Sequence, residues 1–201
     1  MGITPAMLVP AIVAISFAAG LNVYATAATL GLLARFGVFT LPPDLHLLAS
    51  PWVIGASLLL FLVEFFADKI PVFDLFWNAL HTFVRVPVAA LLAYGAAAHL
   101  SPAMQAACAA LGAVVALAAH GGKTAARTAV TASPEPLSNT ALSAGEDVLA
   151  IGLTWFATQH PVMAALVAIA FLAVIVLLAR AVIRAMAGMF RRPRAPARAR
   201  T

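Results

Sequence analysis

Residues 161–179 read PVMAALVAIAFLAVIVLLA and contain no charged side chain. A helix of about 18 or more apolar residues is long enough to cross the ~30 Å hydrocarbon core of a bilayer. The rest of the chain is similar, because 64% of its 201 residues are hydrophobic, 9% are charged, and the mean hydropathy is +1.02. Soluble domains carry roughly 25% charged residues. The composition therefore predicts an all-α, polytopic transmembrane helical bundle.

Six apolar membrane segments are predicted. They cover residues 6–36, 51–66, 73–98, 102–119, 137–158 and 161–190. The first is too long for one straight span, since about 30 residues rising ~1.5 Å each reach ~45 Å. Gly20 and Asn22 predict a break in it, and Pro87 predicts a break in the third because proline has no backbone N–H. Full crossing and turning back both stay open for these two segments.

The positions of lysine and arginine predict the orientation. With six alternating segments, one side of the membrane carries Lys69, Lys123, Arg127, Arg191, Arg192, Arg194, Arg198 and Arg200. The connections 37–50, 99–101 and 159–160 hold neither residue type. Because basic loops stay in the cytoplasm, both termini are predicted to be cytoplasmic. We expect residues 1–190 to form one domain, followed by a basic, disordered tail at 191–201.

Charge and the N-terminal sequence exclude two other classes. The net charge of +5 comes largely from the arginine tail, which is typical of a membrane-surface segment and not of a nucleic-acid binding protein. No lysine or arginine precedes Arg35, so the basic region of a secretory signal is missing. We therefore expect the first apolar segment to be retained as a membrane helix.

A repeated tripeptide suggests two related halves, 6–98 and 102–190. Ala-Ser-Pro opens an apolar segment at 49–51 and again at 132–134, and a gapless alignment places Glu64 opposite Asp147. Three segments per half is an odd number, so the second copy would be inverted. Inverted repeats with broken helices are a recurrent transporter design, with the site at the repeat interface. The alternative is a chance match of a common tripeptide.

The motif EFFADKIP at 64–71 places charges where an apolar run ends. Glu64 and Asp68 are four residues apart and share a helix face, and Lys69 can neutralise one of them. A cation or proton site at the mouth of a cavity is one interpretation, and solvated charges at a helix end are the other. For Glu64 we favour the first, because burying a lone carboxylate in a membrane costs several kcal/mol.

Four polar residues of the third segment have helical spacing and share one face: Asp74, Asn78, His81 and Arg85. A helix lying on the membrane surface would have the same pattern. We favour a stripe that enters the bundle. Arg85 would then pair with Glu64 or with the acidic pair at 146–147, and His81 could relay a proton.

The fourth segment ends in a basic face formed by His120, Lys123 and Arg127. A cytoplasmic flank is an adequate explanation for Lys123. The glycines at 121–122 weaken a helix or permit close helix approach. They do not have the spacing of a phosphate-binding loop.

The fifth segment carries the strongest candidates. Prolines bracket Glu135, Asn139 or its neighbour Ser138 can cap the following helix, and Glu146 lies directly before Asp147. Adjacent carboxylates near membrane depth repel each other, so at least one is expected to bind a cation, pair with arginine or hold a proton. The structural alternative is an ion pair with Arg85 or Arg127.

Together these patterns predict substrate or ion binding by Glu64, Asp68, His81, Arg85, Asn139, Glu146 and Asp147. Secondary candidates are Asn22, Lys69, Asp74, Asn78, His120, Lys123, Arg127 and Glu135. Asn22 belongs to a polar stripe in the first segment for which we favour a role in bridging helices.

Catalytic motifs are missing from the sequence. It contains neither HExxH nor GxSxG, so we expect no enzyme, and no cofactor or metal-ligand set is assigned. Cys108 lies in an apolar run and is interpreted as a small packing residue.

Several blocks together resemble a bacterial membrane-protein family catalogued as domain of unknown function 4126. They are GLNVYAT at 20–26, LGLLAR at 30–35, ASPW at 49–52, EFFADKIP at 64–71, His81-Thr82 with Arg85, SPEPLSN at 133–139 and Glu146-Asp147. Val88-Ala89 departs from the glycine expected after Pro87. The resemblance covers nearly the whole chain to about residue 190 and implies a location in the bacterial inner membrane. It supplies no activity.

Two functions remain in view. The leading hypothesis is a transporter or channel-like protein for an ion or small charged solute, using a buried carboxylate and arginine cluster. The alternative is a non-transporting membrane protein in which the cluster is structural or binds a partner or lipid headgroups, with lipid scrambling as a sub-case. The expected partners are the lipid bilayer, an ion or small solute, and a second copy of the chain.

Overall fold

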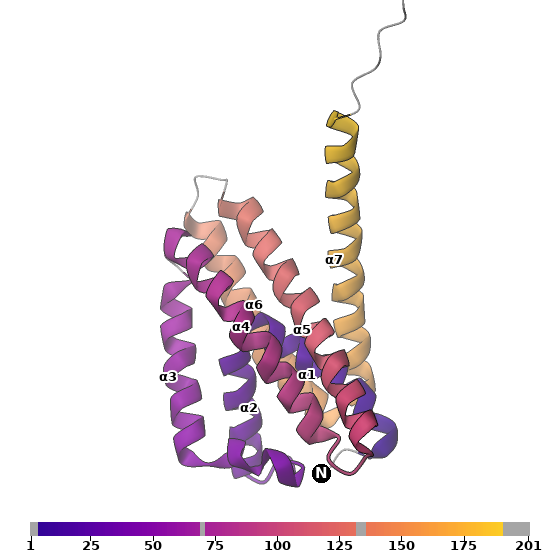
Figure 1. The fold of residues 1–201 in the computed structure, drawn as a ribbon. Coiled ribbons are helices and arrows are strands. Elements are labelled where there is room, and N and C mark those ends of the chain that lie inside the picture. The colour runs from indigo at the N-terminus through magenta and orange to yellow at the C-terminus, as the bar shows by residue number, and fades with distance from the viewer. Residues whose placement is uncertain (1–3, 69–70, 132–135, 191–201) are drawn as a thin grey trace, which may run out of the picture.

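A computed structural model describes residues 4–68, 71–131 and 136–190, and these residues form helices and no strand. The elements are η1 (Pro5–Met7), α1 (Leu8–Leu21), α2 (Val23–Arg35), η2 (Pro43–Ala49), α3 (Pro51–Ala67), α4 (Pro71–Ala96), α5 (Pro102–Thr131), α6 (Pro136–Gln159) and α7 (Pro161–Phe190). Figure 1 shows α3 to α7 as roughly upright rods around α1 and α2. The predicted all-α bundle is confirmed.

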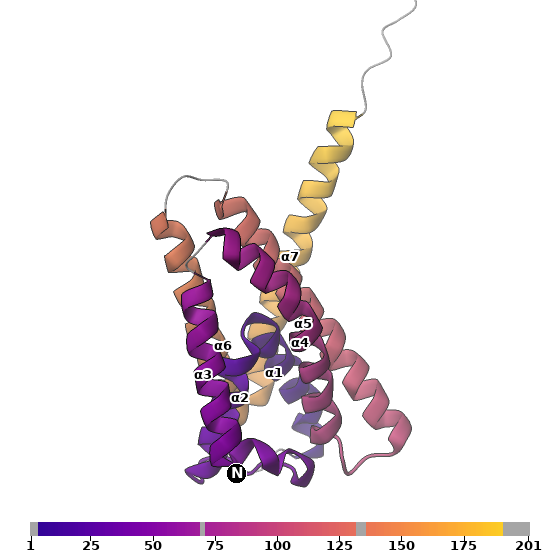
Figure 2. The same ribbon diagram turned by 60° about the vertical axis from the view of Figure 1, so that its left-hand side comes forward.

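Helices α1 and α2 form a hairpin that turns back inside the bundle. α1 rises beside α5, where Gly20 lies against Ala116 and Ala119. α2 then descends beside α6, where the hydroxyl of Thr154 donates to Thr26 at 3.4 Å. Both views show the pair starting and ending at the foot of the bundle (Figures 1 and 2). The predicted break lies at Asn22, the single residue between the two helices.

Three described helices are long and apolar enough to cross a membrane, through the windows Ala79–Ala96, Pro102–Arg127 and Pro161–Arg184. A fourth span results if η2 and α3, which are bent by 64° relative to each other, are counted as one broken segment. Six spans are therefore not confirmed. The N end lies at the foot of the bundle and α7 ends at its head (Figure 1), and the membrane side that each of them faces stays a prediction.

The break predicted at Pro87 is wrong, because α4 is helical from Pro71 to Ala96 with Pro87 inside it. The fourth segment is also longer than predicted. α5 continues beyond residue 119 to Thr131, because the basic side chains that follow His120 point into the bundle and not into solvent. The inverted repeat is not confirmed either, since unbroken α5 is the counterpart of the broken α1–α2 pair.

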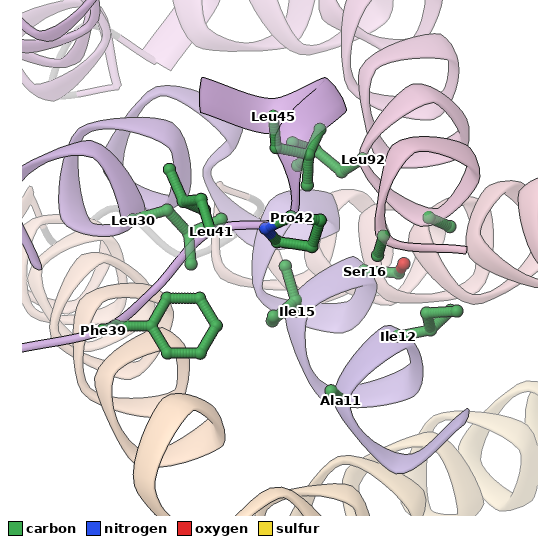
Figure 3. A pocket seen from close by; sticks show the side chains of 12 residues that line it. Ala11, Ile12, Ile15, Ser16, Leu30, Phe39, Leu41, Pro42, Leu45 and Leu92 are labelled. Carbon is green, nitrogen blue, oxygen red and sulfur yellow. The ribbon is translucent and has the colours of Figure 1, made fainter. Parts of the chain in front are cut away.

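The space between the hairpin and α4 is filled from below by the loop that leads into η2. Phe39, Leu41 and Leu45 lie there with Ile15 and Leu92 around a cavity of about 30 Å³ (Figure 3). Such a volume holds little more than a water molecule, and the lining is apolar apart from Ser16. The foot of the hairpin is thus closed by a hydrophobic plug.

Close packing of α1 on α5 predicts a penalty for any side chain at Gly20. A Cβ there would lie 2.5 Å from the carbonyl oxygen of Ala116 and 2.8 Å from the Cβ of Ala119, and a backbone oxygen cannot rotate away. We expect Gly20→Ala to lower the free energy of unfolding by about 1–3 kcal/mol, as overpacked cores do. Thermal unfolding in detergent measures this.

Gly55→Ala is the matched control, because nothing lies within 4 Å of a Cβ at that position of α3. It should leave stability unchanged or raise it by up to about 1 kcal/mol through helix propensity. Equal effects of the two substitutions would contradict the close approach of α1 and α5.

Candidate functional site

The break between α1 and α2 is held by its own polar groups. Asn22 is fully buried and has an extended backbone. Its Oδ1 accepts a hydrogen bond from the backbone N–H of Ala25 at 2.9 Å, which caps α2. Its Nδ2 donates to Oδ1 of Asp147 at 2.8 Å. The side-chain amide of Asn22 therefore caps α2 at the turn of the hairpin and joins the turn to α6 by a hydrogen bond.

Lys123 lies at the centre of a buried charged network. Its Nζ donates to the carbonyl oxygen of Leu21 at 3.0 Å, at the end of α1 where helix carbonyls lack partners. The same ammonium lies 3.4 Å from Oε1 of Glu64, 3.3 Å from Oδ2 of Asp68 and 3.5 Å from Oε2 of Glu146. One side chain thus connects α1, α3, α5 and α6.

Two arginines complete the network. Arg127 reaches Oδ2 of Asp68 at 2.7 Å and Oε2 of Glu146 at 2.5 Å through Nη2, and its Nε donates to that same Glu146 oxygen at 3.0 Å. Arg85 forms an ion pair with Oε1 of Glu64. Both guanidinium groups are fully buried, as are Glu64 and Asp68. Burial of charges on this scale in a bundle is tolerated only when they are paired.

Two histidines border the network. Nη1 of Arg85 lies 2.6 Å from Nδ1 of His120, and since arginine can only donate, this nitrogen is the acceptor. His120 is then neutral, and its Nε2 donates to the hydroxyl of Thr82 at 2.8 Å. Nδ1 of His81 donates to the carbonyl of Trp77 at 2.8 Å, and its Nε2 lies 3.0 Å from the hydroxyl of Tyr24.

Acidic groups exceed basic groups in the network. Among the described side chains it contains the carboxylates Glu64, Asp68, Glu146 and Asp147 and the cations Arg85, Lys123 and Arg127. With every group ionised, one negative charge is left over. Asp147 is 4% exposed, and its Oδ2 is buried without a hydrogen-bond partner among the described residues. Oε2 of Glu64 is likewise buried without a hydrogen-bond partner among the described residues.

Most residues of the predicted binding set meet in this network. Glu64, Asp68, His81, Arg85, Glu146 and Asp147 are buried there. Asn22, His120, Lys123 and Arg127 from the secondary set lie with them. The predicted pairing of Arg85 with Glu64 is confirmed, and so is an ion pair between Glu146 and Arg127.

The interpretation of Lys123 as a cytoplasmic flank is wrong, because the side chain is fully buried among carboxylates. The surface-helix alternative for the third segment does not hold at His81 and Arg85, which are both buried. Lys69 and Glu135 lie outside the described residues, as do the side chains of Asp74, Asn78 and Asn139.

Sequence reasoning missed three contributors: the Leu21 carbonyl, Tyr24 and Thr82. A sequence does not indicate which backbone carbonyl will accept a hydrogen bond from a side chain. For Thr82 a signal existed, since it adjoins His81 on a helix whose polar face was recognised.

The arrangement can hold or release a proton or a cation. Its surplus carboxylate adjoins a helix break, which is where discontinuous helices of transporters place ion sites. A cluster of three or more His, Cys, Asp or Glu side chains with metal-binding geometry does not occur in the described part of the chain.

A family model described as "Domain of unknown function (DUF4126)" matches residues 9–181. Neither the curated proteins nor the solved structures that were compared with the chain gave a match.

A double-mutant cycle tests the pairing of Glu64 with Arg85. Removing one partner leaves a buried uncompensated charge, so Glu64→Gln and Arg85→Met should each lower the free energy of unfolding by about 3–5 kcal/mol. The double variant should lose clearly less than the sum of the two, because both charges are gone. Arg184→Met on the exposed part of α7 is the control and should have little effect. Additive losses would show that the two side chains do not act as a pair.

Proposed function

Because the chain belongs to the DUF4126 family, whose description states no activity, we propose its function from the site: a membrane transport protein for an ion or small charged solute. The observation that carries the proposal is the buried carboxylate of Asp147, which is in excess of the cations among the described residues of the network and is bonded to the break between α1 and α2. A purely structural network would be most stable with its charges balanced. The surplus leaves room for a transported proton or cation.

The mechanism follows from what Asp147 touches. Its Oδ1 holds Asn22, and Asn22 caps α2. Binding of a proton or cation at the free oxygen weakens the attraction of this carboxylate for the Asn22 amide and for nearby Lys123. The hairpin and α6 are then free to change their relative position, so that occupancy biases which side of the network is open. Arg85 stays paired with Glu64, and Arg127 stays paired with Glu146, during this step.

The plug at the foot of the hairpin supports a gate on that side. Phe39, Leu41 and Leu45 separate the network from the foot of the bundle. Apolar constrictions close a pathway by excluding water. The alternative function, a structural or partner-binding network, predicts that loss of the surplus carboxylate changes stability and no flux.

We propose an inner-membrane orientation in which the head of the bundle is cytoplasmic. α7 ends at the head and is followed in the sequence by the arginine tail, in agreement with the positive-inside rule. Length and composition allow α4, α5 and α7, and α3 together with η2, to cross the membrane. We propose that α6 crosses beside them and that the hairpin turns back. The N-terminus then lies outside and the C-terminus inside.

Cysteine labelling tests this orientation in a Cys108→Ala background. We expect a membrane-impermeant maleimide to label Ala6→Cys and Leu47→Cys in intact cells, because both positions are exposed at the foot of the bundle. Arg198→Cys should be labelled only after permeabilisation. If Ala6→Cys instead behaves like Arg198→Cys, the six-span orientation with two cytoplasmic termini holds.

Flux through proteoliposomes tests the transport proposal. With a potassium diffusion potential and a trapped pH or sodium dye, the wild-type protein should pass protons or sodium ions. Asp147→Asn keeps the bond with Asn22 sterically feasible but removes the charge. Flux through Asp147→Asn should fall at least about tenfold, which corresponds to a loss of about 1.4 kcal/mol in the free energy of ion binding.

Asp44→Asn is the matched control, because it makes the same substitution at an exposed position of η2. It should conduct as the wild type does. Equal flux through both variants, or none through the wild type with either ion, refutes the proposal. A changed melting temperature without flux would favour the structural alternative.

A further inference from the structure

A large apolar groove lies between α5, α6 and α7 and reaches the charged network. Its volume is about 810 Å³, within the range of about 300–1,000 Å³ that is typical of small-molecule sites. The groove is open along α6, where Val148 is 71% exposed and Gly145 and Gly152 have no atom within 4 Å of a Cβ position. In a bundle embedded in lipid, this opening faces the membrane interior.

Among the described residues that line the groove, two carry a charge, Lys123 and Glu146. They are not equally accessible. The side chain of Glu146 is 8% exposed, whereas that of Lys123 is completely buried behind its carboxylate partners. A molecule in the groove therefore meets the carboxylate of Glu146 at the inner end. Its Oε2 is held by Arg127 and Lys123, and the described side chains of the network carry one negative charge in excess.

Aromatic rings supply a second feature that favours a cation. Phe17 and Phe171 lie with ring centroids 5.9 Å apart on the inner wall, and Phe156 lines the same space. The faces of such rings attract cations, the more so when water is excluded. The remaining lining is aliphatic or glycine, which suits an apolar body.

We propose that this groove binds a lipophilic cation, an apolar molecule with one positive charge, which enters sideways from the membrane and reaches Glu146. The inference rests on the proposed transport function and names its substrate class. A bilayer phospholipid fits less well, because its phosphate would meet a site with a surplus of carboxylate. The cation would add the positive charge that the network lacks.

Tetraphenylphosphonium and tetraphenylborate test the proposal as probes of equal shape and opposite charge. Binding to the purified full chain in detergent is measured by equilibrium dialysis. The wild type should bind the phosphonium at least about tenfold more tightly than the borate. Equal binding would mean that the groove is merely apolar and filled by lipid chains, and preference for the borate would reverse the assigned charge; both outcomes overturn the proposal.

Two substitutions localise the binding. Gly145→Trp fills the groove from a position where a side chain meets no atom, so it should weaken phosphonium binding at least about tenfold. The control Gly55→Trp makes the same change on α3, outside the groove, and should bind as the wild type does. Glu146→Gln should remove the preference for the cation. Unchanged binding by Gly145→Trp overturns the proposal even if Glu146→Gln fails to fold.

The readouts separate this inference from the transport proposal. Phosphonium binding that Gly145→Trp abolishes, without flux of protons, sodium ions or phosphonium in proteoliposomes, supports the groove and refutes transport. Flux that depends on Asp147, without phosphonium binding, supports transport and refutes the groove. Dimers that Gly145→Trp dissociates, with no phosphonium binding, would assign the groove to a second copy of the chain.

Discussion

The buried ammonium of Lys123 is the interaction on which the rest of the structure depends. It contacts the end of α1 and also carboxylates from α3 and α6. A broken helix in a membrane interior is unstable unless its open carbonyls and amides find partners. Lys123 supplies a partner for the carbonyl of Leu21, and Asn22 supplies one for the amide of Ala25. The turn of the hairpin and the charged network therefore stabilise each other.

The same arrangement accounts for the contrast between the two ends of the bundle. Below the break, the hairpin legs enclose apolar side chains and a cavity of about 30 Å³. Above it, carboxylates and guanidinium groups occupy the space, and a groove of about 810 Å³ connects them with the lipid-facing surface. Closure below and access from the side are both consequences of where the chain turns back.

Much of this could be predicted from the sequence, for reasons that differ by residue. Asn22 lies within a segment too long for one span, so the break was foreseeable, and Glu64 and Arg85 stood out as charges in apolar surroundings. Hydropathy cannot distinguish a charge that leaves the membrane from one that is paired inside it. For that reason α5 was predicted to end before Lys123, and that secondary candidate was interpreted as a cytoplasmic flank. The direction of the chain after Asn22 depends on tertiary contacts with α5 and α6, which no local pattern encodes.

Pro87 illustrates the opposite error. A missing N–H removes one helix hydrogen bond, yet α4 continues through it. Contacts with α5 hold the helix on both sides of Pro87, because Thr82 and Arg85 bond to His120 and Ala89 packs against Gly112. A residue that disfavours a helix predicts a break reliably only where the backbone groups released by the break find hydrogen-bond partners.

The hairpin also constrains how the protein is made. α1 and α2 leave the ribosome first, but the partners of their turn belong to helices translated later, up to Asp147 on α6. The carbonyl of Leu21 lacks its partner Lys123 until α5 is present, and the side-chain amide of Asn22 lacks its partner Asp147 until α6 is present. The N-terminal pair therefore cannot complete its polar contacts before α6 is present, although it precedes α6 in the chain.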